Sequence, residues 1–115
     1  MLKCLYNSFM YASCGLRTVW KEERNFRIEA VIGLLVFVFS ILSDFNFVEM
    51  GFIIFSITIV LTAEMVNTAI EDLCNKVEPN TDPIIGKVKD VMSAFVLVST
   101  FGTVCIGILV ILNHF

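Results

Sequence analysis

The sequence predicts an all-α membrane protein of one domain, with an amphipathic N-terminal surface helix followed by three transmembrane helices. The chain has 115 residues, of which 57% are hydrophobic and 17% charged, and its mean hydropathy is +0.87. A soluble domain of this length has too little interior to hide so much apolar side chain. Three uncharged apolar stretches also follow one another, and every basic residue lies outside them.

Residues 2–22 are expected to form a helix that lies in the membrane interface. Five apolar residues recur there at helical spacing: Leu2, Leu5, Phe9, Ala12 and Leu16. Trp20 closes the stretch, and aromatic side chains of this kind favour the headgroup level. The alternative is a poorly ordered leader.

The three apolar stretches are expected to cross the membrane at about residues 28–48, 50–72 and 86–112. The third has an uncharged core at 91–112, which is longer than the about 20 residues that a spanning helix needs. The uncharged cores of the first two are shorter, and either alone could be a buried helix of a soluble protein. Together the three stretches predict a three-span protein.

The basic residues predict its orientation. All eight Lys and Arg residues lie before the first span or between the uncharged cores of the second and third spans. The positive-inside rule therefore places the N-terminus and the 71–90 connection in the cytoplasm, and the C-terminus outside.

Turn-forming residues mark both connections. Residues 43–47 are expected to form a tight hairpin, and the two prolines at 79 and 83 predict a loop before the third span. Asp82 followed by Pro83 is typical of a helix N-cap and first helical position. The four cysteines have no CxxC spacing and are expected to be reduced packing residues. No ligand set surrounds His114 in the sequence, and no role is assigned to it.

A polar stripe emerges from the second apolar stretch. Glu64, Asn67, Thr68 and Glu71 have spacings that place them on one face of a helix. Ionisable groups inside a membrane normally face a protein interior or a wet cavity, where they serve function. Carboxylates with nearby lysines suit magnesium and phosphate, and the lack of a Gly-rich phosphate loop excludes a Walker-type site. Residue chemistry alone predicts a metal- or phosphate-handling membrane site.

Five elements follow one another along the chain: Gly15-Leu16-Arg17, Glu23, Phe26-Arg27, Glu64-Met65-Val66-Asn67-Thr68-Ala69-Ile70-Glu71 and Lys89-Asp90-Val91-Met92-Ser93-Ala94. Their order resembles that of the prokaryotic diacylglycerol kinase family, which also contains undecaprenol kinases. The resemblance runs from about Tyr11 to the C-terminus. It implies a homotrimer in the bacterial cytoplasmic (inner) membrane, with cytoplasmic active sites between subunits. It also implies that ATP is the phosphoryl donor, that a lipid alcohol is the acceptor and that Mg²⁺ is the cofactor. Membrane lipids are further expected partners, and no nucleic acid partner is expected.

The resemblance also implies roles for single residues. Glu64 matches the general base that takes the proton of the lipid hydroxyl, and Glu23 and Glu71 match the carboxylates that hold the magnesium of MgATP. Further positions that contact the nucleotide are Tyr11, Asn80, Thr81, Asp82, Lys89 and Asp90. Positions that contact the lipid are Glu29, Glu64, Asn67 and Ser93. One position departs from the family pattern: Asn75 stands where an aspartate is usual, so we keep it outside the metal shell.

Several alternatives stay open at this point. Glu64 and Asn67 could be interhelical polar contacts, Glu23 a solvated charge, and Lys89 a lysine that snorkels to the interface. We expect a diacylglycerol kinase that makes phosphatidic acid, a reading favoured by Trp20 and Glu29. Residues 23–26 favour the undecaprenol branch instead. A proton-coupled transporter or assembly subunit, with Glu64 as its proton carrier, is a third hypothesis.

Overall fold

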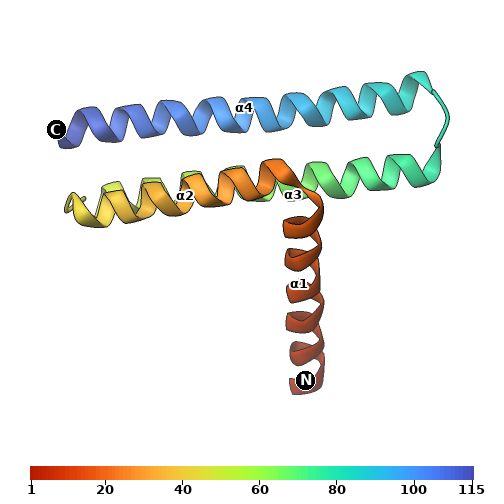
Figure 1. Ribbon diagram of the computed structural model, residues 1–115, viewed down its shortest axis with the longest axis horizontal. Coiled ribbons are helices and arrows are strands. Elements are labelled where there is room, and N and C mark those ends of the chain that lie inside the picture. The colour runs from red at the N-terminus through yellow and green to blue at the C-terminus, as the bar shows by residue number, and fades with distance from the viewer.

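The computed structural model describes residues 1–115 and consists of four helices. They are α1 (Leu2–Glu22), α2 (Arg24–Leu42), α3 (Phe47–Val77) and α4 (Pro83–His114). The last three run alongside one another, whereas α1 leaves the bundle across their direction (Figure 1). Each of the three is long and apolar enough to cross a membrane. The expectation of an all-helical chain with three candidate spans is confirmed.

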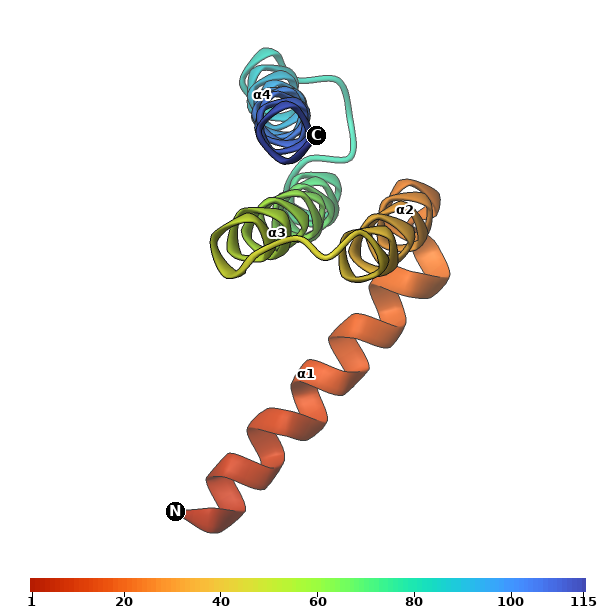
Figure 2. The ribbon, with the colours of Figure 1, turned by 90° about the vertical axis from the view of Figure 1, so that its left-hand side faces the viewer.

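Helix α3 is the centre of the bundle, because both α2 and α4 pack against it, on neighbouring faces (Figure 2). It carries eight of the 14 buried residues of the chain. Large apolar side chains such as Leu34 on α2 and Leu97 on α4 remain exposed. So much exposed apolar surface would be unfavourable in water, and it suits lipid or further protein. One close contact joins α2 to α3: a Cβ atom at Gly33 would lie 2.9 Å from Cγ2 of Ile57.

The elbow between α1 and α2 is fixed by Arg27. Glu23 adopts an extended conformation and ends α1. Nη1 of Arg27 then donates hydrogen bonds to the carbonyl oxygens of Trp20 at 2.6 Å and Lys21 at 3.0 Å. The last carbonyl groups of a helix have no partner within it, and a cation there also complements the helix dipole. These hydrogen bonds hold the end of α1 against the start of α2, and so they fix the position of Glu23 at the elbow.

Both connections between the long helices are short and capped. Helix α2 ends at Leu42, before the expected limit of residue 48, because the chain turns at Ser43 and Asp44 takes a positive φ of 56°. At the other connection, Oδ1 of Asp82 accepts hydrogen bonds from the amides of Ile84 at 2.9 Å and Ile85 at 3.1 Å. Pro83 is the first residue of α4, so the predicted helix start is confirmed.

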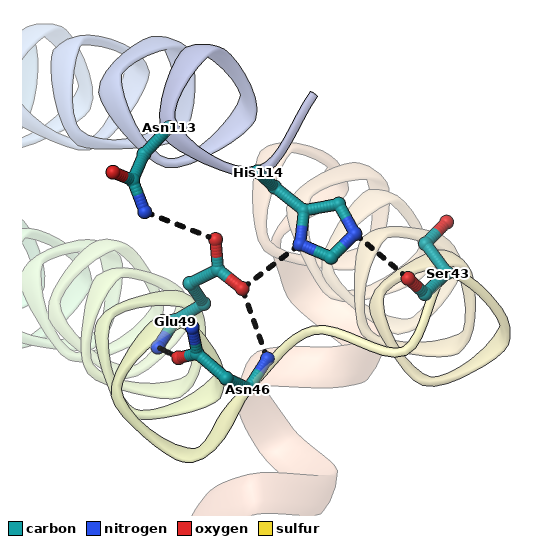
Figure 3. A network of polar contacts seen from close by, with 5 residues as sticks. All are labelled: Ser43, Asn46, Glu49, Asn113 and His114. Atoms are coloured by element: carbon teal, nitrogen blue, oxygen red, sulfur yellow. Dashed lines mark hydrogen bonds and ion pairs between the residues drawn. The ribbon is translucent and has the colours of Figure 1, made fainter.

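A polar network closes the end of the bundle where α2 meets α3 (Figure 3). Glu49 and Asn46 form a reciprocal capping box at the start of α3. Nδ1 of His114 lies 3.0 Å from Oε1 of Glu49, and Nε2 lies 2.8 Å from the carbonyl oxygen of Ser43. Asn113 donates to the other Glu49 oxygen at 3.4 Å. The view that His114 has no partners was wrong, because its partners are distant in sequence.

Candidate active site

Acidic side chains from the elbow, α2 and α3 come together near the start of α2. We name Glu23, Glu29, Glu64 and Glu71 the carboxylate cluster. Glu64 is buried on α3 with 4% of its surface exposed, and the half-buried Glu29 of α2 lies beside it. Glu23 lies at the elbow, close enough for electrostatic repulsion by Glu71 and Glu64. The structure thus gathers the predicted base, both predicted magnesium carboxylates and one predicted lipid contact.

The charge of this cluster is not compensated within the chain. Burial raises the pKa of Glu23 above its ordinary value, and the negative charges of Glu71, Glu64, Asp72 and Glu22 raise it further. No Lys or Arg forms an ion pair with the cluster, since the one ion pair of the chain joins His114 to Glu49. A bound cation would therefore relieve the repulsion among these carboxylates.

These residues fit a magnesium ion that arrives with a nucleotide. No three acidic, histidine or cysteine side chains are gathered closely enough to hold a metal by themselves. Magnesium is often bound by one or two carboxylates together with phosphate oxygens. Glu23 and Glu71 could supply the carboxylates, and the phosphates of a nucleotide would supply further oxygens.

A small polar cavity of about 100 Å³ lies between α3 and α4. Its lining residues are Asn67, Ile70, Glu71, Lys89, Met92 and Ser93. The cavity therefore brings the predicted phosphate-binding lysine and a predicted metal carboxylate to one place, next to two predicted lipid contacts. Residues so arranged can bind a charged group and a hydroxyl group together.

Asn75 holds the lysine of this cavity. Nζ of Lys89 donates a hydrogen bond to Oδ1 of Asn75 at 2.7 Å. The amide is neutral, so it positions the ammonium group without cancelling its charge. Sequence analysis kept Asn75 out of the metal shell and assigned it no other role. Its position four residues after Glu71 places it on the same helical face, which was a signal for such a role.

A larger, apolar cavity of about 400 Å³ lies among α2, α3 and α4. Glu29 lines it, and the lining extends along the bundle to Phe45 and Ile111. Its surface is almost wholly apolar apart from Glu29 and a few serine and threonine residues. A long apolar ligand with one polar end would match this distribution.

Two buried polar atoms near the carboxylate cluster have no partner. They are Oε2 of Glu29 and Oγ1 of Thr68. A buried polar atom without a hydrogen bond costs about 1–3 kcal/mol. Such atoms are expected where a bound group completes the hydrogen bonding.

Other predicted nucleotide contacts do not line the polar cavity. Tyr11 is 75% exposed on α1, about 16 Å of helix before the elbow. Asn80, Thr81 and Asp90 are exposed, and Asp82 uses Oδ1 to cap α4. Within one chain the structure therefore assembles only part of the predicted site.

The family model described as prokaryotic diacylglycerol kinase matches residues 10–111. The chain belongs to this family. The resemblance carried by the sequence motifs is confirmed, and the protein is a membrane lipid kinase. Family membership removes the reason for the transporter hypothesis.

Individual relatives cover most of the chain. The diacylglycerol kinase of Escherichia coli (strain K12) is 30% identical over 105 residues, which are 91% of this chain and 86% of that protein. The diacylglycerol kinase of Haemophilus influenzae is 28% identical over 107 residues, or 91% of each chain. The undecaprenol kinase of Bacillus subtilis (strain 168) is 27% identical over 111 residues, or 96% of this chain and 90% of that protein. The relatives of this chain are thus named for two different lipid alcohols.

Proposed function

We propose that this protein transfers the γ-phosphoryl group of MgATP to the hydroxyl of diacylglycerol, giving phosphatidic acid, in the bacterial cytoplasmic membrane. One observation carries the proposal. The buried carboxyl group of Glu64 lies beside Glu29, which lines the apolar cavity. Asn67, one helical turn away, lines the polar cavity with Lys89. A lipid hydroxyl and a triphosphate could therefore meet at Glu64.

Each group has a defined part in this reaction. Glu64 takes the proton of the lipid hydroxyl as its oxygen bonds to the γ-phosphorus, and the bond between that phosphorus and the ADP oxygen breaks. Lys89 offsets the charge on the phosphates. Magnesium bound with ATP would neutralise phosphate charge, with Glu23 and Glu71 holding it. Glu29, Asn67 and Ser93 orient the acceptor, while the apolar cavity takes an acyl chain.

The proposal includes a homotrimer. Tyr11 and the 80–82 loop do not line the polar cavity of their own chain, so a neighbouring subunit would have to supply contacts of this kind. The exposed apolar side chains of α2 and α4 offer surface for subunit packing. Helix α1 would lie on the cytoplasmic membrane surface, which suits its direction across the three long helices (Figure 1).

The assay of the purified protein tests the reaction. Protein in detergent is given MgATP and diacylglycerol, and phosphatidic acid is the expected product. The Glu64→Gln variant should form it at least about 100-fold more slowly while it elutes at the same oligomeric size. Glu22→Gln, a change at an exposed neighbour without an assigned role, should remain active. Absence of a phosphorylated lipid with both diacylglycerol and undecaprenol would refute the kinase function.

Undecaprenol is the second candidate acceptor. It is favoured by the undecaprenol kinase of Bacillus subtilis, whose alignment covers 96% of this chain. Both lipids present one hydroxyl on a long apolar body, so the apolar cavity suits either. Values of kcat/KM measured side by side decide between them, and a higher value for undecaprenol would replace the acceptor without changing the site.

A further inference from the structure

We propose that Glu49 and His114 form a proton-operated latch, in which one exchangeable proton between the two side chains holds the end of α4 onto the turn between α2 and α3. This latch lies at the end of the bundle away from the carboxylate cluster. It uses residues to which the kinase reaction gives no part, so it does not depend on the proposed function.

The hydrogen-bond geometry requires the proton. A carbonyl oxygen can only accept, so Nε2 of His114, 2.8 Å from the Ser43 oxygen, carries a hydrogen. The other ring nitrogen, Nδ1, lies 3.0 Å from Oε1 of Glu49. Without a proton between these two atoms, a nitrogen lone pair would face a carboxylate lone pair, and the contact would be repulsive. A neutral ring has one N–H, so it can donate to Ser43 or to Glu49 but not to both, and the two contacts coexist only while a further proton sits on Nδ1 or on Oε1.

The surroundings of the pair consist of hydrogen-bond donors to Glu49 and an aromatic ring beside His114. The Glu49 side chain is 5% exposed, and it also accepts hydrogen bonds from Asn46 at 2.9 Å and Asn113 at 3.4 Å. The His114 ring lies over Phe45 with 4.5 Å between ring centroids, which is within the range of a cation–π contact. The His114 side chain is 21% exposed, so its proton can exchange with the solution at this end of the bundle.

No other positively charged group can balance the charge of Glu49. Residues 28–75 and 90–115 contain no Lys or Arg. On the turn, Asp44 is the only other charged residue, and it forms no ion pair with His114. Helix α2 contributes only apolar and hydroxyl side chains here, among them Phe39 and Ser40. The charge of the buried Glu49 is therefore balanced by His114 or not at all.

The latch joins helices that otherwise have few contacts. Helix α4 packs mainly on α3, whereas His114 reaches the carbonyl group of Ser43 that ends α2 (Figure 3). The apolar cavity of about 400 Å³ also ends here, at Phe39, Phe45 and Ile111. Loss of the proton should release the end of α4 and loosen this end of the cavity.

The pH dependence of thermal unfolding tests the latch in the full-length protein in detergent. The proton is bound at low pH, so the stability that the latch contributes should be present there and be lost as the pH rises. Between about pH 5 and pH 9, which brackets the ordinary histidine value, the melting temperature of the wild type should fall by about 5 °C more than that of Glu49→Gln. A glutamine side chain can pair with a neutral ring, so it keeps the contact without the extra proton. Asp44→Asn should retain the wild-type dependence.

Nitrogen NMR of the ring gives a second readout, which stays valid if His114→Ala fails to fold. His114 is the only histidine of the chain, so its signals are unambiguous in a protein without a histidine tag. We expect Nδ1 to titrate in the wild type, and the ring of Glu49→Gln to stay neutral at pH values where the wild-type pair holds its proton. Identical melting curves for wild type and Glu49→Gln at all pH values, or an Nδ1 signal that never titrates, would overturn the latch.

Discussion

The two ends of the helical bundle differ in whether a buried glutamate has a basic partner. Glu49 and Glu64 lie on the same helix, α3, and each is only 4% exposed. The carboxylate of Glu49 accepts hydrogen bonds from the backbone amide of Asn46 and the side chain of Asn113, and it contacts His114. Glu64 instead belongs to a group of carboxylates with no basic partner in the chain. Burial alone therefore does not single out Glu64 from Glu49; the difference between them is that Glu49 has a basic partner.

The physical reason is the cost of removing charge from water. An uncompensated buried ion costs several kcal/mol even after the protein relaxes, and a partner with good geometry offsets that cost. At the histidine end, which comprises Ser43, Asn46, Glu49, Asn113 and His114, the fold supplies the partners itself. At the carboxylate cluster the chain supplies no basic partner, which is why we propose that a bound magnesium nucleotide supplies the missing positive charge.

Replacing each buried glutamate by glutamine should give the largest difference between the two ends of the bundle, in both turnover and unfolding. Glu64→Gln should lower kcat by a factor of about 10²–10⁴, the usual contribution of a general base, without lowering the melting temperature. Glu49→Gln should keep its turnover while the pH dependence of its unfolding changes. Lipid phosphorylation and thermal unfolding, measured on both variants, check the contrast. Equal loss of turnover in the two variants would contradict it.

Lys89 and Asn75 should show the next largest effect. Lys89→Met removes a charged hydrogen-bond donor worth about 1.5–3 kcal/mol, so kcat/KM for MgATP should fall by about 10-fold to 150-fold. Asn75→Ala leaves the charge but frees the ammonium group, which should cost about 0.5–1.5 kcal/mol, or about 2-fold to 10-fold. Steady-state kinetics with varied MgATP measures both. The exposed Lys76 offers the matched control Lys76→Met, which should leave kcat/KM unchanged.

At the histidine end, loss of the helix cap should have a purely structural effect. The side chain of Asn46 accepts a hydrogen bond from the Glu49 amide at 2.9 Å. Asn46→Ala should lower the free energy of unfolding by about 1 kcal/mol, the usual value of an N-cap, with MgATP kinetics unchanged. Denaturation followed by circular dichroism measures it. A change in the KM for MgATP would show that the two ends are coupled.

The pH dependence of magnesium activation should be the smallest effect, because Glu23 is only half-buried. Burial and then the charges of Glu71, Glu64 and Asp72 raise the pKa of Glu23. Glu23 therefore keeps its proton to a higher pH than a free glutamate, and the magnesium requirement should increase as the pH falls through this raised value. The apparent magnesium constant, measured against pH, should vary less in Glu23→Gln. Ionised Glu23 also destabilises the fold, so this contribution to instability should disappear at low pH.

Local patterns in the sequence were sufficient for much of this protein. The helical spacing of Glu64, Asn67 and Glu71, the Asp82 cap and the three apolar stretches each depend on residues a few positions apart. Backbone geometry converts such spacings into faces, caps and spans with little help from the rest of the chain. The family resemblance has the same source, since its motifs are short runs.

Contacts between helices could be decided only by the tertiary structure. His114 meets Glu49 across 65 positions and Lys89 meets Asn75 across 14, and Glu29 of α2 meets Glu64 of α3. Helical periodicity predicts which face of a helix a residue occupies. It does not predict how far along the helix axis that face packs against a neighbouring helix. The relative height and rotation of packed helices depend on the fit of many side chains at once. For this reason the sequence by itself determined the helices and the acidic stripe, whereas packing decided which acid is neutralised and which stays available for chemistry.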